Sequence, residues 1–202
     1  MHSVEELLRY YNQVKAKLKK RLNDFRNVKG DAIFYECCFC ILTPQSNAKQ
    51  CWAAVERLIQ NSFIDKDINP EQLVYPIRFY KNKSKYLIQM KNNFGMIKGS
   101  IEKIKDGRQL RNHFAMNVTG YGMKEASHFM RNIGYRNLAI LDRHILKNLC
   151  HFGVIETMPK TLTPKIYQWI EEKFVRFAKK LNIPMDELDL LFWSAETGEI
   201  FK

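Results

Sequence analysis

Apolar residues recur every three to four positions along the first 25 residues of the chain, which is the spacing of one helix face. The apolar face comprises Val4, Leu7, Leu8, Tyr11, Val14, Leu18, Leu22 and Phe25. Ser3, three residues before Glu6, is placed to cap the start of such a helix. The opposite face carries lysine or arginine at positions 9, 15, 17 and 19–21. This basic face is interpreted either as a solvated surface or as a contact for phosphate groups.

The rest of the chain also favours helices. Residues 32–42 form an almost unbroken apolar run, typical of a helix that is buried on all sides. Further helices are predicted over 51–59 with Ser46 or Asn47 as the cap, from 71, twice within 81–105, from Thr163-Pro164 onward, and over 186–193. Few segments alternate with period two, and hairpin dipeptides such as Asn-Gly are scarce. We therefore expect an all-α fold.

The composition adds a strong positive charge to this picture. The 202 residues contain 33 Lys and Arg against 21 Asp and Glu, which gives a formal net charge of +12 at pH 7. Such an excess favours a polyanionic partner, most simply nucleic acid. The length fits one large domain or two small lobes that share a core.

The five cysteines match neither a disulfide framework nor a zinc site. Cys37, Cys38 and Cys40 are crowded together, and Cys51 and Cys150 form no second ligand pair, so all five are interpreted as buried thiols in a reducing compartment. No apolar run reaches the ~20 residues of a membrane span. The first residues also lack the apolar centre of a signal peptide. We expect a cytoplasmic protein without membrane contact.

The stretch from residue 110 to 133 reads as two helices joined by a tight hairpin that contains Gly120 and Gly122. Glycines in a Gly-x-Gly turn allow positive φ and a close approach of a neighbouring group. Amides in such a turn, beside a helix N-terminus, are oriented toward an anion such as a DNA phosphate. An ordinary helix–helix turn explains the same pattern, so this motif alone leaves both interpretations open.

Lys124 follows in the first turn of the second helix, where the helix dipole disfavours a cation by ~0.3–1 kcal/mol. The same field favours an amine that must be neutral to attack carbon, although a plain surface lysine remains the alternative. Asp142, 18 residues later, stands at the start of a further predicted helix. It is interpreted as an N-cap, and a capping carboxylate in a buried site can also stabilise developing positive charge.

These segments resemble the helix-hairpin-helix DNA glycosylase superfamily. The matching runs are GYGMKEA at 120–126 and LAILDRHIL at 138–146. ASHFMRN at 126–132, LTPQS at 42–46 and GEIFK at 198–202 are similar to archaeal-type (type 2) 8-oxoguanine DNA glycosylases. The resemblance implies one domain over residues 1–202, with the hairpin at 110–133 and two helical lobes that enclose the active site in a cleft. The chain departs from the superfamily in lacking Gly or Pro at 138–141, and from its iron–sulfur branch in lacking a cysteine after Cys150.

The resemblance also implies an activity, that of a bifunctional N-glycosylase and AP lyase. Lys124 would attack the deoxyribose, expel 8-oxoguanine and form a Schiff base, and Asp142 would stabilise the cationic sugar. β-Elimination would then nick the strand 3′ to the site. The partner would be double-stranded DNA containing 8-oxoguanine, bound by a monomer at the prokaryotic nucleoid, with no cofactor and no catalytic metal.

The remaining roles that the resemblance implies concern base flipping and recognition. A flipped base leaves a gap in the duplex, and Gln45 lies at the superfamily's wedge position. Lys202, whose terminal carboxylate is able to accept from the N7–H of 8-oxoguanine, would distinguish it from guanine. The predicted substrate-recognition residues are Lys202, Trp193 and Phe201, with Phe192 as a further aromatic candidate, and the predicted DNA-binding residues are Gln45, Gly120, Gly122 and His144.

Two alternatives remain at this stage. A non-catalytic helix-hairpin-helix protein would bind duplex DNA through the same hairpin and basic surface. A glycosylase for another oxidised base, for instance an oxidised pyrimidine, would keep the Lys124 chemistry and change only the lesion.

Overall fold

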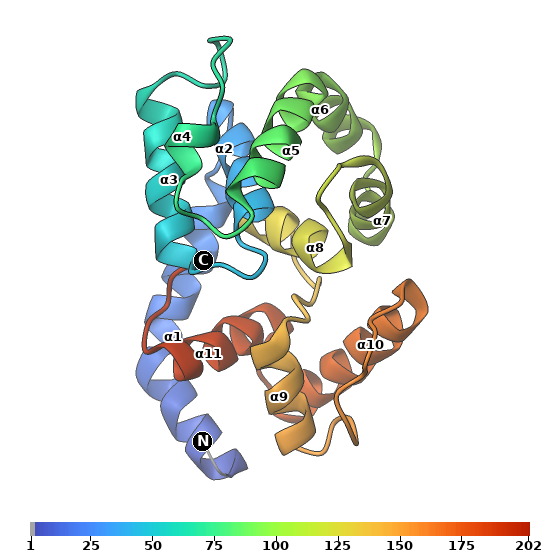
Figure 1. Cartoon of the computed structure of the whole chain (residues 1–202). Coiled ribbons are helices and arrows are strands. Elements are labelled where there is room, and N and C mark those ends of the chain that lie inside the picture. Colours follow the sequence, from blue (N-terminus) through green and yellow to red (C-terminus); the bar gives the residue numbers. More distant parts are fainter. Residues whose placement is uncertain (1–2) are drawn as a thin grey trace. The chain divides into compact units, whose positions relative to one another are not determined.

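A computed structural model describes residues 3–202 of the chain (Figure 1). These residues form eleven helices and no strand, so the predicted all-α fold is confirmed for them. The chain divides into two compact units. Unit 1 joins the described residues up to Asn27 with Gly134–Lys202, and unit 2 is the intervening Val28–Ile133. The N-terminal helix therefore belongs with the C-terminal part of the chain.

Unit 2 is built around a central apolar helix, α2. Nine of its twelve residues are buried, because α3, α5 and α8 pack on it. An aromatic cluster fills this core, in which the Phe34 ring meets the rings of Phe94 and Phe63. The helices of unit 2 are α2 (Asp31–Leu42), α3 (Ala48–Gln60), α4 (Glu71–Val74), α5 (Tyr80–Asn92), α6 (Phe94–Lys103), α7 (Gly107–Asn117) and α8 (Met123–Asn132).

Unit 1 places the long N-terminal helix α1 against the C-terminal helix α11, which also contacts α9 and α10. A buried hydrogen bond of 2.6 Å from the Tyr11 hydroxyl to Glu187 joins α1 to α11. The core also holds a stack of the Phe152, Phe192 and Phe174 rings. The helices of unit 1 are α1 (Val4–Arg26), α9 (Arg143–His151), α10 (Pro164–Lys180) and α11 (Met185–Thr197).

The predicted helix starts are borne out at several caps. Ser3 accepts from Glu6 N–H, and Thr163 accepts from Ile166 N–H with Pro164 in the first turn. Of the two candidates before α3, Asn47 is the cap, since its side chain accepts from Gln50 N–H. The last helix is longer than predicted and ends at Thr197.

The cysteines follow the prediction with one exception. Cys37, Cys38, Cys40 and Cys51 are buried, but Cys150 is partly exposed, which corrects the expectation for that residue. Burial raises the pKa of the Cys37 and Cys38 thiols and keeps them protonated. Among residues 3–202, no helix combines the length and the apolar character needed to cross a membrane.

Candidate functional site

The hairpin connects the end of α7 at Asn117 to the start of α8 at Met123. Gly120 has φ +88°, and a Cβ there would lie 2.9 Å from Cδ2 of Tyr86, so both reasons for a glycine apply. Gly122 differs from the expectation, because its φ is −113°. It stands at the N-cap of α8, a position that requires extended backbone. The positive-φ prediction is therefore correct for Gly120 and wrong for Gly122.

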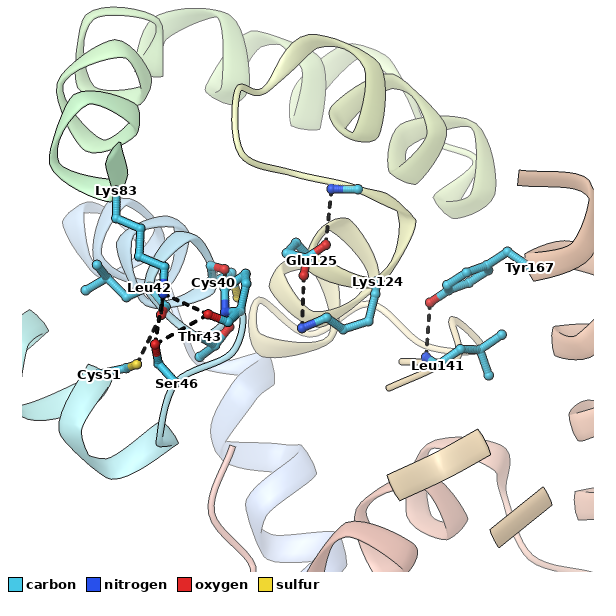
Figure 2. A network of polar contacts seen from close by, with 12 residues as sticks. Cys40, Leu42, Thr43, Ser46, Cys51, Lys83, Lys124, Glu125, Leu141 and Tyr167 are labelled. Carbon is cyan, nitrogen blue, oxygen red and sulfur yellow. Dashed lines mark hydrogen bonds and ion pairs between the residues drawn. The ribbon is translucent and has the colours of Figure 1, made fainter. Parts of the chain in front are cut away.

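Lys124 is the second residue of α8, and its side chain is 25% exposed. Its Nζ lies 3.0 Å from Oε1 of the neighbouring Glu125. The other oxygen, Oε2, accepts from the N–H of Gly122 at 3.2 Å. Figure 2 shows the Glu125 side chain beside that of Lys124. Glu125 therefore places a negative charge at the N-terminus of α8, where the helix dipole favours it, and holds the lysine there.

Asp142 is the N-cap of α9, as predicted. Its Oδ1 accepts from the N–H of Ile145 at 2.8 Å. An Asp N-cap stabilises a helix by about 1 kcal/mol. The cap fixes the carboxylate at the mouth of the helix, which is compatible with the proposed second role of this residue.

The segment before Asp142 is held by buried side chains that sequence reasoning missed. Its backbone N–H groups donate to three carboxylates: Asn137 to Asp186 (3.0 Å), Ala139 to Glu171 (2.8 Å) and Ile140 to Asp189 (3.0 Å). The hydroxyl of Tyr167 accepts from Leu141 N–H and donates to the Ala139 carbonyl. The sequence contains one signal for these acids, which is their placement among apolar residues. Asp186 and Asp189 lie about one turn apart on α11, and Glu171 lies about one turn after Tyr167 on α10.

This arrangement explains how the segment functions without the glycines and prolines that the superfamily often has there. Glu171, Asp189 and Asp186 are 1%, 3% and 5% exposed. Buried amides need acceptors, and here side chains from α10 and α11 supply them in place of a ladder or a turn. Four of its N–H groups and the Ala139 carbonyl are thereby fixed by side chains from α10 and α11.

A turn at residues 43–46 follows α2 and carries Gln45, which has φ +55°. The N–H of Ser46 donates to the carbonyl of Thr43 at 3.0 Å and closes the turn. Lys83 of α5 reaches this turn, with its Nζ 2.7 Å from the Leu42 carbonyl oxygen (Figure 2). Nothing in the sequence singles out Lys83 except its position four residues before Leu87, which places both on the inward face of α5.

Lys83 is nearly fully buried, with 4% of its surface exposed. Burial lowers its pKa to about 8, with the charges of Lys124 and Arg78 adding to that decrease and Cys51 opposing it. At neutral pH the ammonium form therefore still prevails, with three N–H donors.

The C-terminal candidates do not all behave as predicted. Phe192 is completely buried in the aromatic stack of unit 1, so its ring face is not open to a base, and this candidate is wrong. Trp193, Phe201 and Lys202 are partly exposed. The Nδ1 of His144 lies 3.6 Å from Oε2 of Glu196.

Lys124 belongs to unit 2 and Asp142 belongs to unit 1. Their pairing across a cleft stays a prediction, as do the roles given to the other site residues. No group of three or more His, Cys, Asp or Glu residues within 3–202 is arranged to hold a metal ion.

Comparison with known proteins places this arrangement in context. A family model described as 8-oxoguanine DNA glycosylase matches residues 18–183. A Fusobacterium nucleatum protein named 8-oxoguanine DNA glycosylase/AP lyase is 41% identical over 98% of this chain and 96% of its own. The crystal structure of the Thermotoga maritima 8-oxoguanine DNA glycosylase matches with a TM-score of 0.89 and 26% identity, covering 98% of each chain. The Methanocaldococcus jannaschii glycosylase/lyase in complex with a 15mer DNA containing 8-oxoguanine matches with a TM-score of 0.84 and 29% identity, covering 98% of this chain and all of that one.

Proposed function

Because this chain belongs to the 8-oxoguanine DNA glycosylase family, we propose that it excises 8-oxoguanine from duplex DNA and then cleaves the strand at the abasic site. The observation that carries this proposal is the partly exposed lysine in the first turn of α8, directly after the hairpin, in a chain with this family relationship. A protein that only binds DNA has no need of a lysine and an aspartate paired at this spacing, Lys124 and Asp142.

Lys124 is the proposed nucleophile. Its neutral amine forms a bond from Nζ to C1′ of the deoxyribose while the bond from C1′ to N9 of the base breaks. The base leaves with the electron pair and takes up a proton from solvent. Opening of the C1′–O4′ bond then gives an imine between lysine and sugar. For this attack the amine must leave the contact with Glu125 and lose its extra proton.

The imine makes the second step accessible. It acidifies the C2′–H bond, and removal of that proton forms a double bond between C2′ and C3′ and expels the 3′ phosphate. The strand is thereby nicked 3′ to the lesion, and hydrolysis of the imine releases the lysine. One residue thus serves both base removal and strand cleavage.

Asp142 is the proposed stabiliser of the positive charge that develops on the sugar as the base departs. A fixed carboxylate in a site shielded from water stabilises such a transition state strongly. Its cap bond to Ile145 and the buried acceptors along residues 137–141 support this role, because they hold the carboxylate in one orientation before the reaction starts.

The lesion must be flipped out of the duplex, at a cost of a few kcal/mol. We assign Gln45 to the gap that the base leaves, and Gly120, Gly122 and His144 to the DNA backbone. The net charge of +12 favours binding to the phosphates, and this term weakens as salt is added. The relatives that this chain matches are bacterial and archaeal, which supports a place of action at the nucleoid, in the cytoplasm of a prokaryotic cell.

Recognition of the flipped base is assigned to Trp193, Phe201 and Lys202. 8-Oxoguanine carries an N7–H donor where guanine carries an acceptor. An oxygen acceptor, assigned to the main chain of Lys202, distinguishes the two bases, since guanine leaves it unpaired.

A panel of duplexes, each with one lesion, tests the proposed function. We expect the purified protein to release 8-oxoguanine and nick that strand, while a duplex with guanine or an oxidised pyrimidine at the same position stays intact. Release of only the oxidised pyrimidine would change the lesion and keep the chemistry. Tight, salt-sensitive binding with no base released from any duplex would leave a DNA-binding protein without the proposed activity.

A further inference from the structure

The turn that carries Gln45 holds a backbone conformation that glutamine rarely adopts. Gln45 is the third residue of the turn closed by Ser46 N–H and the Thr43 carbonyl, and its φ is +55°. Glycine or asparagine is usual at such a position, because a Cβ is crowded in the left-handed region. Something outside the turn must therefore favour this conformation.

The side chain of Lys83 supplies that favourable contact. Its Nζ lies 2.7 Å from the carbonyl oxygen of Leu42, 2.8 Å from that of Pro44 and 2.9 Å from the Oγ of Ser46. An ammonium group has three N–H donors, and this turn provides three acceptors for them. Figure 2 shows the lysine extended from α5 into the turn.

The bond to Pro44 is the important one for Gln45. The carbonyl of Pro44 belongs to the peptide group that joins Pro44 to Gln45, and the orientation of this group sets the φ of Gln45. In the commoner turn the same peptide group is rotated and the third residue has negative φ. A buried cation that binds the Pro44 oxygen therefore favours the orientation seen here.

We propose that Lys83 is a positioning residue for base flipping, which fixes the Pro44–Gln45 peptide group and so presents Gln45 toward the gap left by the flipped base. This inference rests on the proposed function, and it adds a residue to which the resemblance assigned no role. Lys83 acts through Gln45 and touches no reacting atom. It also keeps its place without an ion pair, since the three contacts described above are to neutral oxygens.

The test compares Lys83→Met with Lys85→Met. Both variants remove one positive charge from α5, but Lys85 is exposed and Lys83 is buried. On a duplex with 8-oxoguanine, we expect Lys83→Met to slow single-turnover base release by roughly tenfold or more, and Lys85→Met to change it less than threefold. On a single strand with the same lesion, where no base must be unstacked, Lys83→Met should release the base at the parent rate.

The folded state of Lys83→Met is checked by its melting temperature. Methionine is similar in length and apolar, and the Leu42 carbonyl keeps the Cys51 thiol as a donor at 3.2 Å, so we expect the variant to fold. Ser46→Ala removes one of the three acceptors and provides a second variant, with a smaller loss expected. Equal losses on the duplex and on the single strand would overturn the proposal, because they indicate general damage to the protein.

A double-mutant cycle with Gln45→Ala decides whether Lys83 acts through Gln45. We expect the double variant to lose no more duplex activity than Gln45→Ala alone. Multiplied losses, or a Gln45→Ala variant with parent activity, would overturn the proposal while the parent still releases 8-oxoguanine. A parent protein that releases no base from the duplex would instead contradict the proposed function.

Discussion

The phenolic oxygen of Tyr167 accepts a hydrogen bond from the backbone N–H of Leu141, the residue immediately before Asp142, at 3.2 Å. The same hydroxyl donates to the carbonyl oxygen of Ala139 at 2.5 Å. One buried side chain of α10 thus holds both ends of the short stretch that leads into Asp142. Beyond it, Asp142 N–H donates to the Ile140 carbonyl at 2.7 Å. The backbone that leads into Asp142 is therefore held by a side chain that lies 26 residues after Leu141 along the chain.

Replacing Tyr167 by phenylalanine tests this relationship. The ring stays in the core, but Leu141 N–H and the Ala139 carbonyl lose their partner, at a cost of about 1–3 kcal/mol. We expect kcat for base release to fall roughly tenfold with little change in KM, because no DNA contact is assigned to residues 137–141. Tyr75→Phe, at an exposed tyrosine of unit 2, is the control. A raised KM with unchanged kcat would contradict a positioning role.

Asp142 has two roles that substitutions can separate. Asparagine caps a helix about as well as aspartate, so Asp142→Asn should keep the melting temperature within a few degrees of the parent. Without the negative charge, base release should fall by roughly 100-fold or more. Asp142→Ala loses both roles and should also be about 1 kcal/mol less stable in urea unfolding. An Asn variant with full activity would show that Asp142 is only a cap.

The sequence predicted the helices well and the contacts between them less well. Helix caps such as Ser3 and Asp142 follow from local chemistry, so a single sequence contains their signal. Ser46 and Asn47 are adjacent, so the sequence alone could not decide which of them caps α3. The contact that engages Ser46 instead, with Lys83, is not visible in the sequence. From the sequence alone, Phe192 could not be distinguished from an aromatic residue that stacks on the flipped base. The burial of its ring depends on how α9, α10 and α11 pack in space.

The same limit applies to the supporting residues of the site. Lys83 lies 37 residues from Ser46 and Glu171 lies 32 from Ala139, so periodicity within one helix gives no hint of either contact. The short sequence motifs carried the family resemblance, but the side chains that hold these motifs in place come from other helices.

The two hairpin glycines should respond differently to alanine. Gly120→Ala meets a positive φ and a contact of 2.9 Å with the Tyr86 ring, so it should cost about 1–3 kcal/mol of unfolding free energy. At Gly122 the φ is ordinary, and the nearest atom is the end of the Glu125 side chain at 3.3 Å. Gly122→Ala should therefore cost less than ~1 kcal/mol. Urea unfolding of both variants measures this, and equal losses would show that the asymmetry is wrong.

Deletion of Lys202 tests the recognition of the lesion. Without this residue the acceptor for the N7–H of the lesion is lost, so the preference for 8-oxoguanine over guanine should decrease by roughly tenfold or more. Cleavage of a duplex with a preformed abasic site should be unchanged, because no base is read there. Lys202→Ala removes only the side chain and keeps the main-chain oxygen at the same position, so it should retain the preference. An unchanged preference after the deletion would remove Lys202 from the recognition site.

Lys124 is proposed to form a covalent bond to the sugar of the damaged nucleotide. Borohydride reduces an imine to a stable amine, so it links the protein permanently to the DNA whenever the Schiff base forms. With a duplex that contains 8-oxoguanine, we expect a covalent protein–DNA adduct for the parent and none for Lys124→Gln. An adduct of undiminished yield with Lys124→Gln, or base release by the parent without any adduct, would contradict it.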